Sequence, residues 1–184
     1  MSHTSIFFIK FSSFSEKPVV PITTFFFSLD AILSTFRVHF GIVKSIITFA
    51  FLNATDGPIY VGKDAEIMEG CVVRGALAMC EHSVLKLGTK IYGATTLGPY
   101  CKVGGEVNNS VLMGYSSKGH DGFLGNSVLG EWCNLGADTN NSNLKNNYAE
   151  VKLWNYETGR FAKTGLQFCG LMMGDHSKCG INTM

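Results

Sequence analysis

The chain has almost no net charge and no long apolar run, and these two absences narrow the classes of function. Its 15 Lys and Arg against 14 Asp and Glu give a formal charge of +1, which offers no electrostatic attraction to nucleic-acid phosphates. In residues 1–54 the longest uncharged stretch, Pro18 to Leu29, is about a dozen residues, whereas a membrane-spanning helix needs roughly 18 or more. We therefore expect neither a nucleic-acid-binding protein nor an integral membrane protein.

Glycine is nearly missing from residues 1–54, which hold one of the 21 glycines but 11 of the 14 phenylalanines. A secretory signal is not favoured, because Lys10 and Glu16-Lys17 surround short Phe/Ser runs without a clear small-residue cleavage site. Residues 1–51 are therefore an atypical hydrophobic leader. Three interpretations of this leader stay open: a loose cap on the fold, a membrane-touching segment, or a non-native leader. We favour the last. The folded domain is expected over residues 52–184.

What the sequence does contain is a six-residue repeat. Aliphatic residues recur at every sixth position: Val61, Ile67, Val73, Met79, Leu85, Ile91, Leu97 and Val103. Four positions after each comes a residue that is mostly small: Ala65, Cys71, Leu77, Ser83, Thr89, Thr95, Cys101 and Val107. Such a period is typical of a parallel β-helix, in which each hexad forms a short strand and a turn. The repeat predicts an all-β, left-handed parallel β-helix whose aliphatic residues point inward.

Two interruptions of the repeat predict structures outside the regular coils. The phase is lost after Val107 and returns with Phe123, Leu129 and Leu135 at inward positions. Residues 108–119 are therefore predicted to form an external loop, because insertions into solenoids lie on the outside. Residues 140–170 contain two apolar segments around Gly159 and predict a hairpin arm.

The six cysteines form no CxxC pair and match no common zinc spacing. Cys71, Cys101 and Cys133 occupy the small inward position of the repeat, where a free thiol acts as a compact apolar residue. Buried free thiols favour a reducing, cytoplasmic location. We therefore expect no structural metal site.

His120 is the candidate catalytic residue. It stands in the segment Lys118-Gly119-His120-Asp121-Gly122, where the predicted external loop rejoins a regular coil. The flanking glycines let the backbone approach a ligand, and an imidazole titrates near neutral pH, as a general base requires. A lone histidine is more often structural, so both interpretations stay open on this observation alone.

Residues 119–139 carry a pattern that resembles a known enzyme family. Gly119-His120 is followed by an aromatic residue at Phe123, by Leu-Gly, and then by Asn134-Leu-Gly-Ala137-Asp-Thr139. This pattern resembles the acetyltransferase domain of the bifunctional glucosamine-1-phosphate acetyltransferase/N-acetylglucosamine-1-phosphate uridylyltransferase family. The similarity extends over residues 52–184. It implies a homotrimer with active sites between subunits, arms that reach a neighbour, and further coils beyond Met184.

The resemblance implies a transferase of sugar-nucleotide biosynthesis that moves acetyl from acetyl-CoA to an amino-sugar phosphate, with no metal required. His120 would be the general base and Asn134 would hold the amine or the sugar. The Ala137 N–H would bind the oxyanion, and Lys145 is assigned with it to oxyanion or co-substrate binding. The carboxylate partner of the base is left open among three residues: Asp121, Glu106 and Asp175.

Phe123, Tyr92 and Asn109 are the implied substrate-binding residues. Tyr92 and Asn109 stand where the family has an Arg and a Lys that bind the sugar phosphate. The sequence therefore departs from the family at the positions that would select glucosamine 1-phosphate as the substrate. Three other basic residues are either replacement phosphate ligands or solvated surface charges: Arg74, Lys86 and Lys118.

Two alternatives from other functional classes stay open. The β-helix is a non-catalytic trimerising or regulatory domain of a sugar-1-phosphate nucleotidyltransferase whose catalytic domain lies outside this sequence. Alternatively, His82, His120 and His176 hold an intersubunit zinc ion. These histidines are widely separated in the sequence and lack the close histidine pair of such sites, so the zinc alternative is the weakest of the three.

Overall fold

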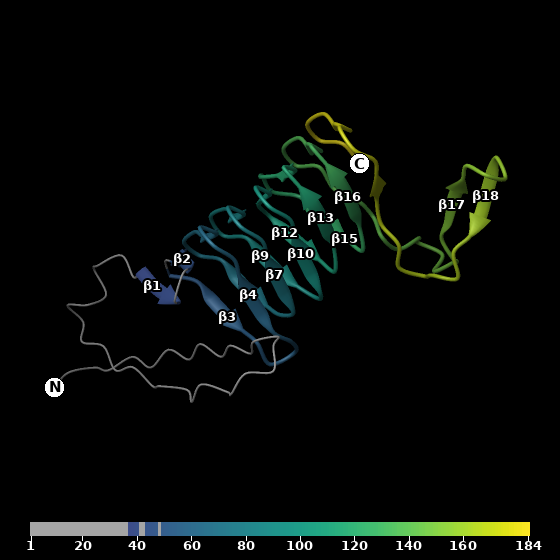
Figure 1. The fold of residues 1–184 in the computed structure, drawn as a ribbon. Helices are drawn as coiled ribbons and strands as arrows, with labels where there is room; N and C mark the ends of the chain where they lie inside the picture. The colour runs from purple at the N-terminus through teal and green to yellow at the C-terminus, as the bar shows by residue number, and fades with distance from the viewer. Residues whose placement is uncertain (1–36, 41–42, 48) are drawn as a thin grey trace.

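The computed structural model of the chain describes residues 37–40, 43–47 and 49–184. Short strands stack coil upon coil into an elongated solenoid, and a two-stranded arm projects near its C-terminal end (Figure 1). This confirms the all-β parallel β-helix that the hexads predict. Within the described ranges there is no helix that could cross a membrane.

Three sheets form the sides of the β-helix, and the chain visits sheets B, C and A in turn. Sheet A has the spatial order β1 (Arg37–Phe40), β2 (Val43–Ile47), β5 (Glu66–Ile67), β8 (Val84–Leu85), β11 (Lys102–Val103) and β14 (Ser117–Lys118). Sheet B contains β3 (Phe51–Asn53), β6 (Val72–Arg74), β9 (Lys90–Tyr92), β12 (Glu106–Asn108) and β15 (Phe123–Gly125). Sheet C contains β4 (Ile59–Val61), β7 (Leu77–Met79), β10 (Thr95–Leu97), β13 (Val111–Gly114), β16 (Val128–Glu131) and β19 (Met172–Met173). In all three sheets neighbouring strands pair in parallel, except that β1 and β2 pair antiparallel.

The core is a set of columns of inward side chains, one column for each sheet. In sheet A, Ile67 pairs with Leu85 and Leu85 with Val103, and all three side chains are fully buried. The small residues of the repeat, such as Ser83 and Cys101, are buried at the corners. All six cysteines are free thiols, as expected.

The external loop predicted for residues 108–119 is wrong. These residues form β13 and β14, and β13 pairs in parallel with both β10 and β16. The coil is only shortened: Leu97 pairs with Leu112, whereas three full hexads separate Met79 from its partner Leu97. The inward residue of β14 is Lys118, so a search for aliphatic residues loses the repeat here.

The inward position predicted for Phe123 is also wrong, by a single position. Leu124 is fully buried and pairs with Val107, whereas Phe123 lies half-buried on the outer face of sheet B beside Glu106. Successive strand residues point to opposite faces, so this shift by one position moves the phenyl ring outside. Leu129 and Leu135 are buried, as predicted.

The hairpin arm is confirmed. β17 (Lys152–Asn155) pairs antiparallel with β18 (Arg160–Lys163), and Trp154 packs edge-on against Phe161. After the arm the chain returns to the β-helix, where Met173 pairs with Leu129 in the next coil of sheet C.

The domain boundary at residue 52 stays a prediction, because residues 1–36 lie outside the described ranges. β2 extends sheet A by pairing in parallel with β5, and β1 pairs with β2. The backbone of β1 and β2 thus continues the sheet before that boundary.

Replacing a core leucine tests the placement of the columns. Leu97→Ala should lower the free energy of unfolding by roughly 2–5 kcal/mol, because Leu97 is fully buried and a cavity would remain. Leu87→Ala is the matched control, since that side chain is 66% exposed. Urea unfolding measures both, and an equal, small effect of the two changes would contradict the proposed core.

Candidate functional site

The corner at which the chain passes from sheet A to sheet B carries His120. We call it the A/B corner; in three successive coils it comprises residues 104–105, 119–122 and 136–139. The His120 side chain is exposed and lines a shallow cavity of about 240 Å³. Lys86, Leu87 and Asp121 line the same cavity, and its other walls are glycines. An imidazole, an ammonium and a carboxylate therefore share one depression.

Close stacking of the coils keeps this cavity shallow. Gly105 has a φ of 71°, and a Cβ atom on it would lie 2.8 Å from the Cα of Asp121 in the next coil. Only glycine fits such a backbone at this distance. The chain below His120 is thus a glycine floor, which gives a ligand access to backbone atoms.

Ala137 and Asn134 lie one coil beyond His120. The Asp138 N–H donates to the Asp121 carbonyl at 3.1 Å, so the corner that contains Ala137 stacks on the corner that contains His120. The Ala137 N–H donates to no acceptor in the described part of the chain. Asn134 is exposed and bridges to Ser117 at the adjacent edge of sheet A.

Phe123 and Tyr92 lie on the outer face of sheet B. Phe123 pairs with Glu106, and the Tyr92 hydroxyl donates a short hydrogen bond to the Glu106 carboxylate. Because that carboxylate accepts the phenolic hydrogen, it raises the pKa of Tyr92 above its usual value. Tyr92 is therefore engaged within sheet B, through its hydrogen bond to the first residue of β12.

Asn109 lies at the opposite end of sheet B, at the corner that leads to sheet C. Its N–H donates to the Tyr92 carbonyl at 3.2 Å, so Asn109 and the Tyr92 backbone are neighbours. The lengths of β12 and β15 separate this corner from the A/B corner. The structure thus brings Tyr92 and Asn109 together, but not beside His120.

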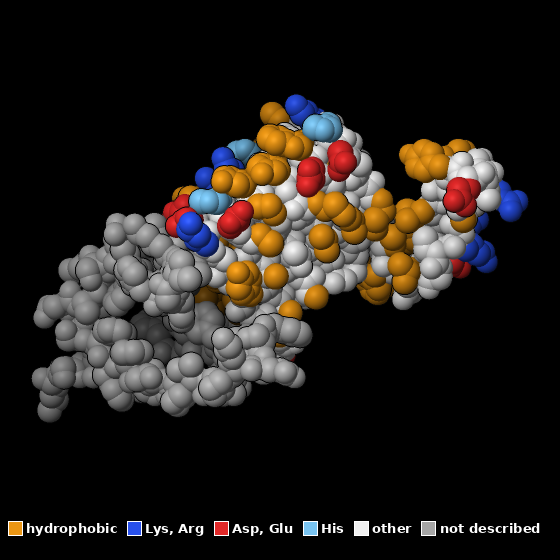
Figure 2. Space-filling view, viewed as in Figure 1, with side chains coloured by type: hydrophobic (Ala, Val, Ile, Leu, Met, Phe, Trp, Pro, Cys, Tyr) orange, Lys and Arg blue, Asp and Glu red, His pale blue; other side chains and the backbone are white. Residues whose placement is uncertain are grey.

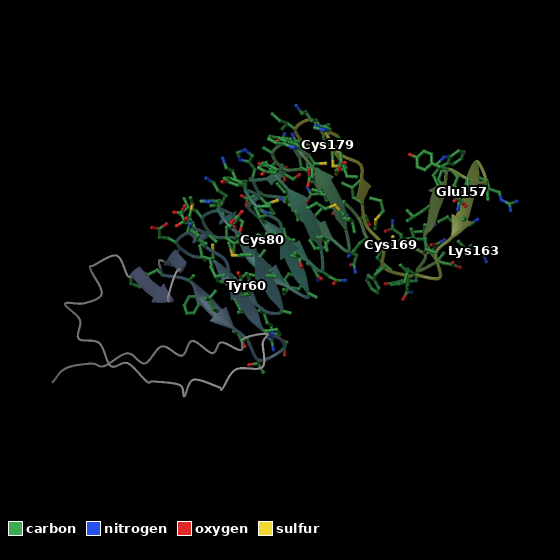
Figure 3. The ribbon with its side chains drawn as sticks, in the orientation of Figure 1. Tyr60, Cys80, Glu157, Lys163, Cys169 and Cys179 are labelled. Carbon is green, nitrogen blue, oxygen red and sulfur yellow. The ribbon has the colours of Figure 1, made fainter. Side chains whose placement is uncertain are left out.

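Lys145 belongs to the insertion that carries the arm. Its Nζ donates to the Glu150 carbonyl at 3.1 Å, and it lines a second cavity of about 420 Å³ together with Asn143 and Cys169. Figure 3 shows Cys169 at the base of the insertion and Glu157 and Lys163 out on the arm. Lys145 and His120 line different cavities within one chain.

Lys118 is not a surface ligand for phosphate. Its side chain is 2% exposed and is the only charged side chain buried within residues 49–184. The Nζ donates to the Gly104 carbonyl at 3.0 Å and to the His120 carbonyl at 2.6 Å. Burial lowers the pKa of this ammonium to about 8, against the opposing attraction of Asp121 and Asp138. Of the three candidate phosphate ligands, Lys86 alone lines the His120 cavity. Arg74 pairs with Asp56.

The corner between sheets C and A carries a row of stacked rings that the sequence analysis missed. The centroid distances are 4.6 Å for His82–Tyr100, 5.3 Å for Tyr100–Tyr115 and 4.5 Å for Tyr115–Trp132. All four residues have positive φ, as corner residues. Figure 2 shows hydrophobic side chains in a row between histidines along this edge. Each ring follows the one before it by the length of one coil, and this recurrence is the sequence signal for the aromatic ladder.

The same corner also bears on the choice of a carboxylate partner for His120. Asp175 Oδ1 accepts the Glu131 N–H there, so Asp175 is not placed to orient His120. Of the other two candidates, Glu106 is bonded to Tyr92 and Asp121 shares the His120 cavity.

The three histidines do not converge on a metal site within one chain. His82 and His176 occupy the corner between sheets C and A, whereas His120 lies on the A/B corner. The described residues contain no group of three or more His, Cys, Asp or Glu side chains that could hold a metal ion.

The site therefore consists of His120, Asp121 and Lys86 in one depression, with the Ala137 N–H in the coil beyond. Such a set can bind an anionic group, accept a proton and donate a hydrogen bond to an oxyanion. Comparisons with known proteins add no assignment, because no family model and no curated protein matches the sequence.

The buried ammonium predicts a specific pH dependence of stability. The folded-state pKa of Lys118 is about 8 and its ordinary value is 10.5, so between these values the unfolded chain binds more protons than the folded one. The penalty for burying the charge is complete below pH 8 and is relieved as the pH rises toward 10.5. Relative to Lys118→Met, the wild-type chain should gain roughly 2 kcal/mol of unfolding free energy between about pH 7 and 9.5. Urea unfolding of both proteins measures this difference, and parallel pH profiles would contradict the burial of Lys118.

Proposed function

We propose that this chain is the acyltransferase domain of an enzyme of sugar-nucleotide biosynthesis, which transfers acetyl from acetyl-CoA to the amine of an amino-sugar phosphate. The observation that carries the proposal is the exposed His120 in a glycine-floored cavity beside Lys86, on a parallel β-helix of hexapeptide repeats. The resemblance of residues 119–139 to the glucosamine-1-phosphate acetyltransferase domain supports the same reaction.

In this proposal His120 accepts a proton from the sugar amine as its nitrogen attacks the thioester carbonyl. A C–N bond forms, the carbonyl oxygen becomes an oxyanion, and the C–S bond then breaks as the thiolate of CoA leaves and takes up a proton. The Ala137 N–H, which has no acceptor in the described part of the chain, is available to the oxyanion. One such donor typically contributes about 3 kcal/mol to the transition state.

The remaining residues have supporting roles in the proposal. Asp121 is the available carboxylate neighbour of His120, and Lys86 offers a positive charge to the sugar phosphate. Asn134 and Phe123 flank the A/B corner on its two sides and would contact the sugar. Tyr92 and Asn109 lie at the far end of sheet B, so they are placed for a distal part of the substrate.

We further propose that the chain works as a homotrimer in the cytoplasm. Along sheet C, one register column of outward residues has no charge from end to end: Tyr60, Ala78, Thr96, Val111, Val128 and Met172. Tyr60 lies on this sheet in Figure 3. The outward residues of sheet A, by contrast, include Glu66 and Lys102. The six free thiols suit a reducing compartment.

A neighbour packed on sheet C would also complete the site. It would supply a second copy of the insertion, which carries Lys145 on a cavity separate from that of His120. Acetyl-CoA could then contact Lys145 of one copy and His120 of another.

One observation favours the non-catalytic alternative, in which the β-helix trimerises or regulates a nucleotidyltransferase encoded with it. The residues at the family's phosphate-binding places, Tyr92 and Asn109, carry no positive charge, and Tyr92 is already bonded to Glu106. A structural domain needs no phosphate grip. Measuring transfer itself separates the two functions.

His120→Ala should reduce the rate of acetyl transfer by roughly 10²–10⁴-fold, as expected for loss of a general base. Purified protein is incubated with acetyl-CoA and glucosamine 1-phosphate, and the N-acetylated sugar is quantified by mass spectrometry. His176→Ala is the control, because His176 is exposed on a different corner, and it should leave the rate unchanged. A wild-type chain without any transfer would favour the non-catalytic alternative, and full activity of His120→Ala would exclude His120 as the base.

Val111→Lys should convert the trimer to monomers, because it places a charge in the middle of the uncharged column of sheet C. Val84→Lys is the matched control, since Val84 is an outward valine on sheet A, in register with Lys102. Sedimentation velocity measures the molar mass of each. If Val111→Lys remains as large as the wild type, sheet C is not the subunit interface.

A further inference from the structure

From β5 to β14 of sheet A, Lys118 is the one inward residue that is not explained by packing. In the successive coils of this column the chain places Ile67, Leu85 and Val103 below it and Leu135 above it, and all four are buried aliphatic residues. A lysine at the same position puts an ammonium into the core, which costs free energy even with partners. The proposed reaction does not use this group, since its Nζ does not reach the cavity that His120 lines.

The contacts of the ammonium indicate what it does. Its two hydrogen bonds join the carbonyl of Gly104 in one coil to the carbonyl of His120 in the next. Both residues belong to the A/B corner and both line the His120 cavity. The charge lies beneath the backbone of the corner, with the carboxylates of Asp121 and Asp138 near it. Charge-assisted hydrogen bonds of this kind are about twice as strong as neutral ones.

His120 itself has few other restraints, although its neighbours are tied to adjacent coils. The Asp121 carbonyl accepts the Asp138 N–H at 3.1 Å, and the Gly122 carbonyl accepts the Glu106 N–H at 3.2 Å. The N–H groups of His120 and Asp121 donate to no acceptor in the described part of the chain. The hydrogen bond from Lys118 to the His120 carbonyl is therefore a main restraint on the residue that carries the imidazole.

We propose that Lys118 is a positioning residue for His120, which fixes the A/B corner from inside the β-helix by binding the Gly104 and His120 carbonyls together. Its effect on acetyl transfer rests on the proposed function of His120. The clamping of the corner does not, and it can be measured without any substrate.

The test compares Lys118→Met with the wild type in the full chain. Methionine keeps an unbranched apolar stem of similar length but removes the donors. The ¹⁵N relaxation order parameters of His120 and Asp121 should fall from about 0.85 to below about 0.6, and kcat should fall at least tenfold with KM changed less than threefold. Ile67→Ala is the control, because it opens a cavity in the same column three coils away and should lower the melting temperature while leaving both readouts unchanged.

A second measurement on the wild type covers the case in which Lys118→Met does not fold. With labelled lysine and glycine, the Lys118 Nζ resonance should titrate with a midpoint near pH 8, and the carbonyl carbon of Gly104 should shift with the same midpoint. A Gly104 carbonyl that does not follow Lys118 would overturn the proposal.

The outcomes also separate this proposal from the proposed function. Order parameters that fall in Lys118→Met while the wild type transfers no acetyl group would support the clamp and reject the acyltransferase. Transfer that is lost in His120→Ala but unchanged in Lys118→Met, with a corner of unchanged rigidity, would overturn the clamp and keep the acyltransferase.

Discussion

The structure depends on the close stacking of each coil on the one before it. Backbone hydrogen bonds run from coil to coil at the strands and at the corners alike, as from Glu66 to Ser83 at a strand. Each position of a coil therefore inherits the environment of the position below it. Inward residues form columns, and corner residues with positive φ, such as His82 and Tyr100, form a stack. The same constraint forces glycine wherever two corners approach closely, as at Gly105.

This stacking also determines what a binding site on one chain can be. The interior is filled with side chains, so both cavities described for the chain lie on its outside, at the A/B corner and in the insertion. A ligand at His120 would rest on a glycine floor and remain open to water on its other side. Residues in the same corner are brought together whatever lies between them in sequence, and residues at opposite ends of one short strand are kept apart. His120 and Ala137 illustrate the first case, and His120 and Asn109 the second.

The coil length explains which parts of this arrangement the sequence could predict. A strict hexad period places the strands through Val107, because their inward residues are aliphatic and each coil holds three full hexads. The period fails at residues 108–119 for two physical reasons: the coil is shorter than three hexads, and its inward residue on sheet A is Lys118. The pairs His120–Ala137 and Tyr92–Asn109 are each separated by one coil, so their stacking was accessible from spacing. The sequence could not predict which corner each pair occupies. This depends on the phase of the repeat, and the shortened coil obscures that phase.

The exposure of His120 connects the two proposed functions of the chain, acetyl transfer and trimerisation. Electrostatic interactions in the transition state are strong only where water is excluded, and in the described part of one chain the insertion lines a cavity other than that of His120 and leaves the imidazole exposed. A neighbouring copy can supply the missing cover, by placing its arm or its outer face over the cavity. In the proposed acetyl transfer, assembly is therefore a condition for catalysis and not an alternative to it. The side chains bear on this choice at two places: His120, Asp121 and Lys86 line the A/B corner, whereas the uncharged Tyr92 and Asn109 lie at the far end of sheet B.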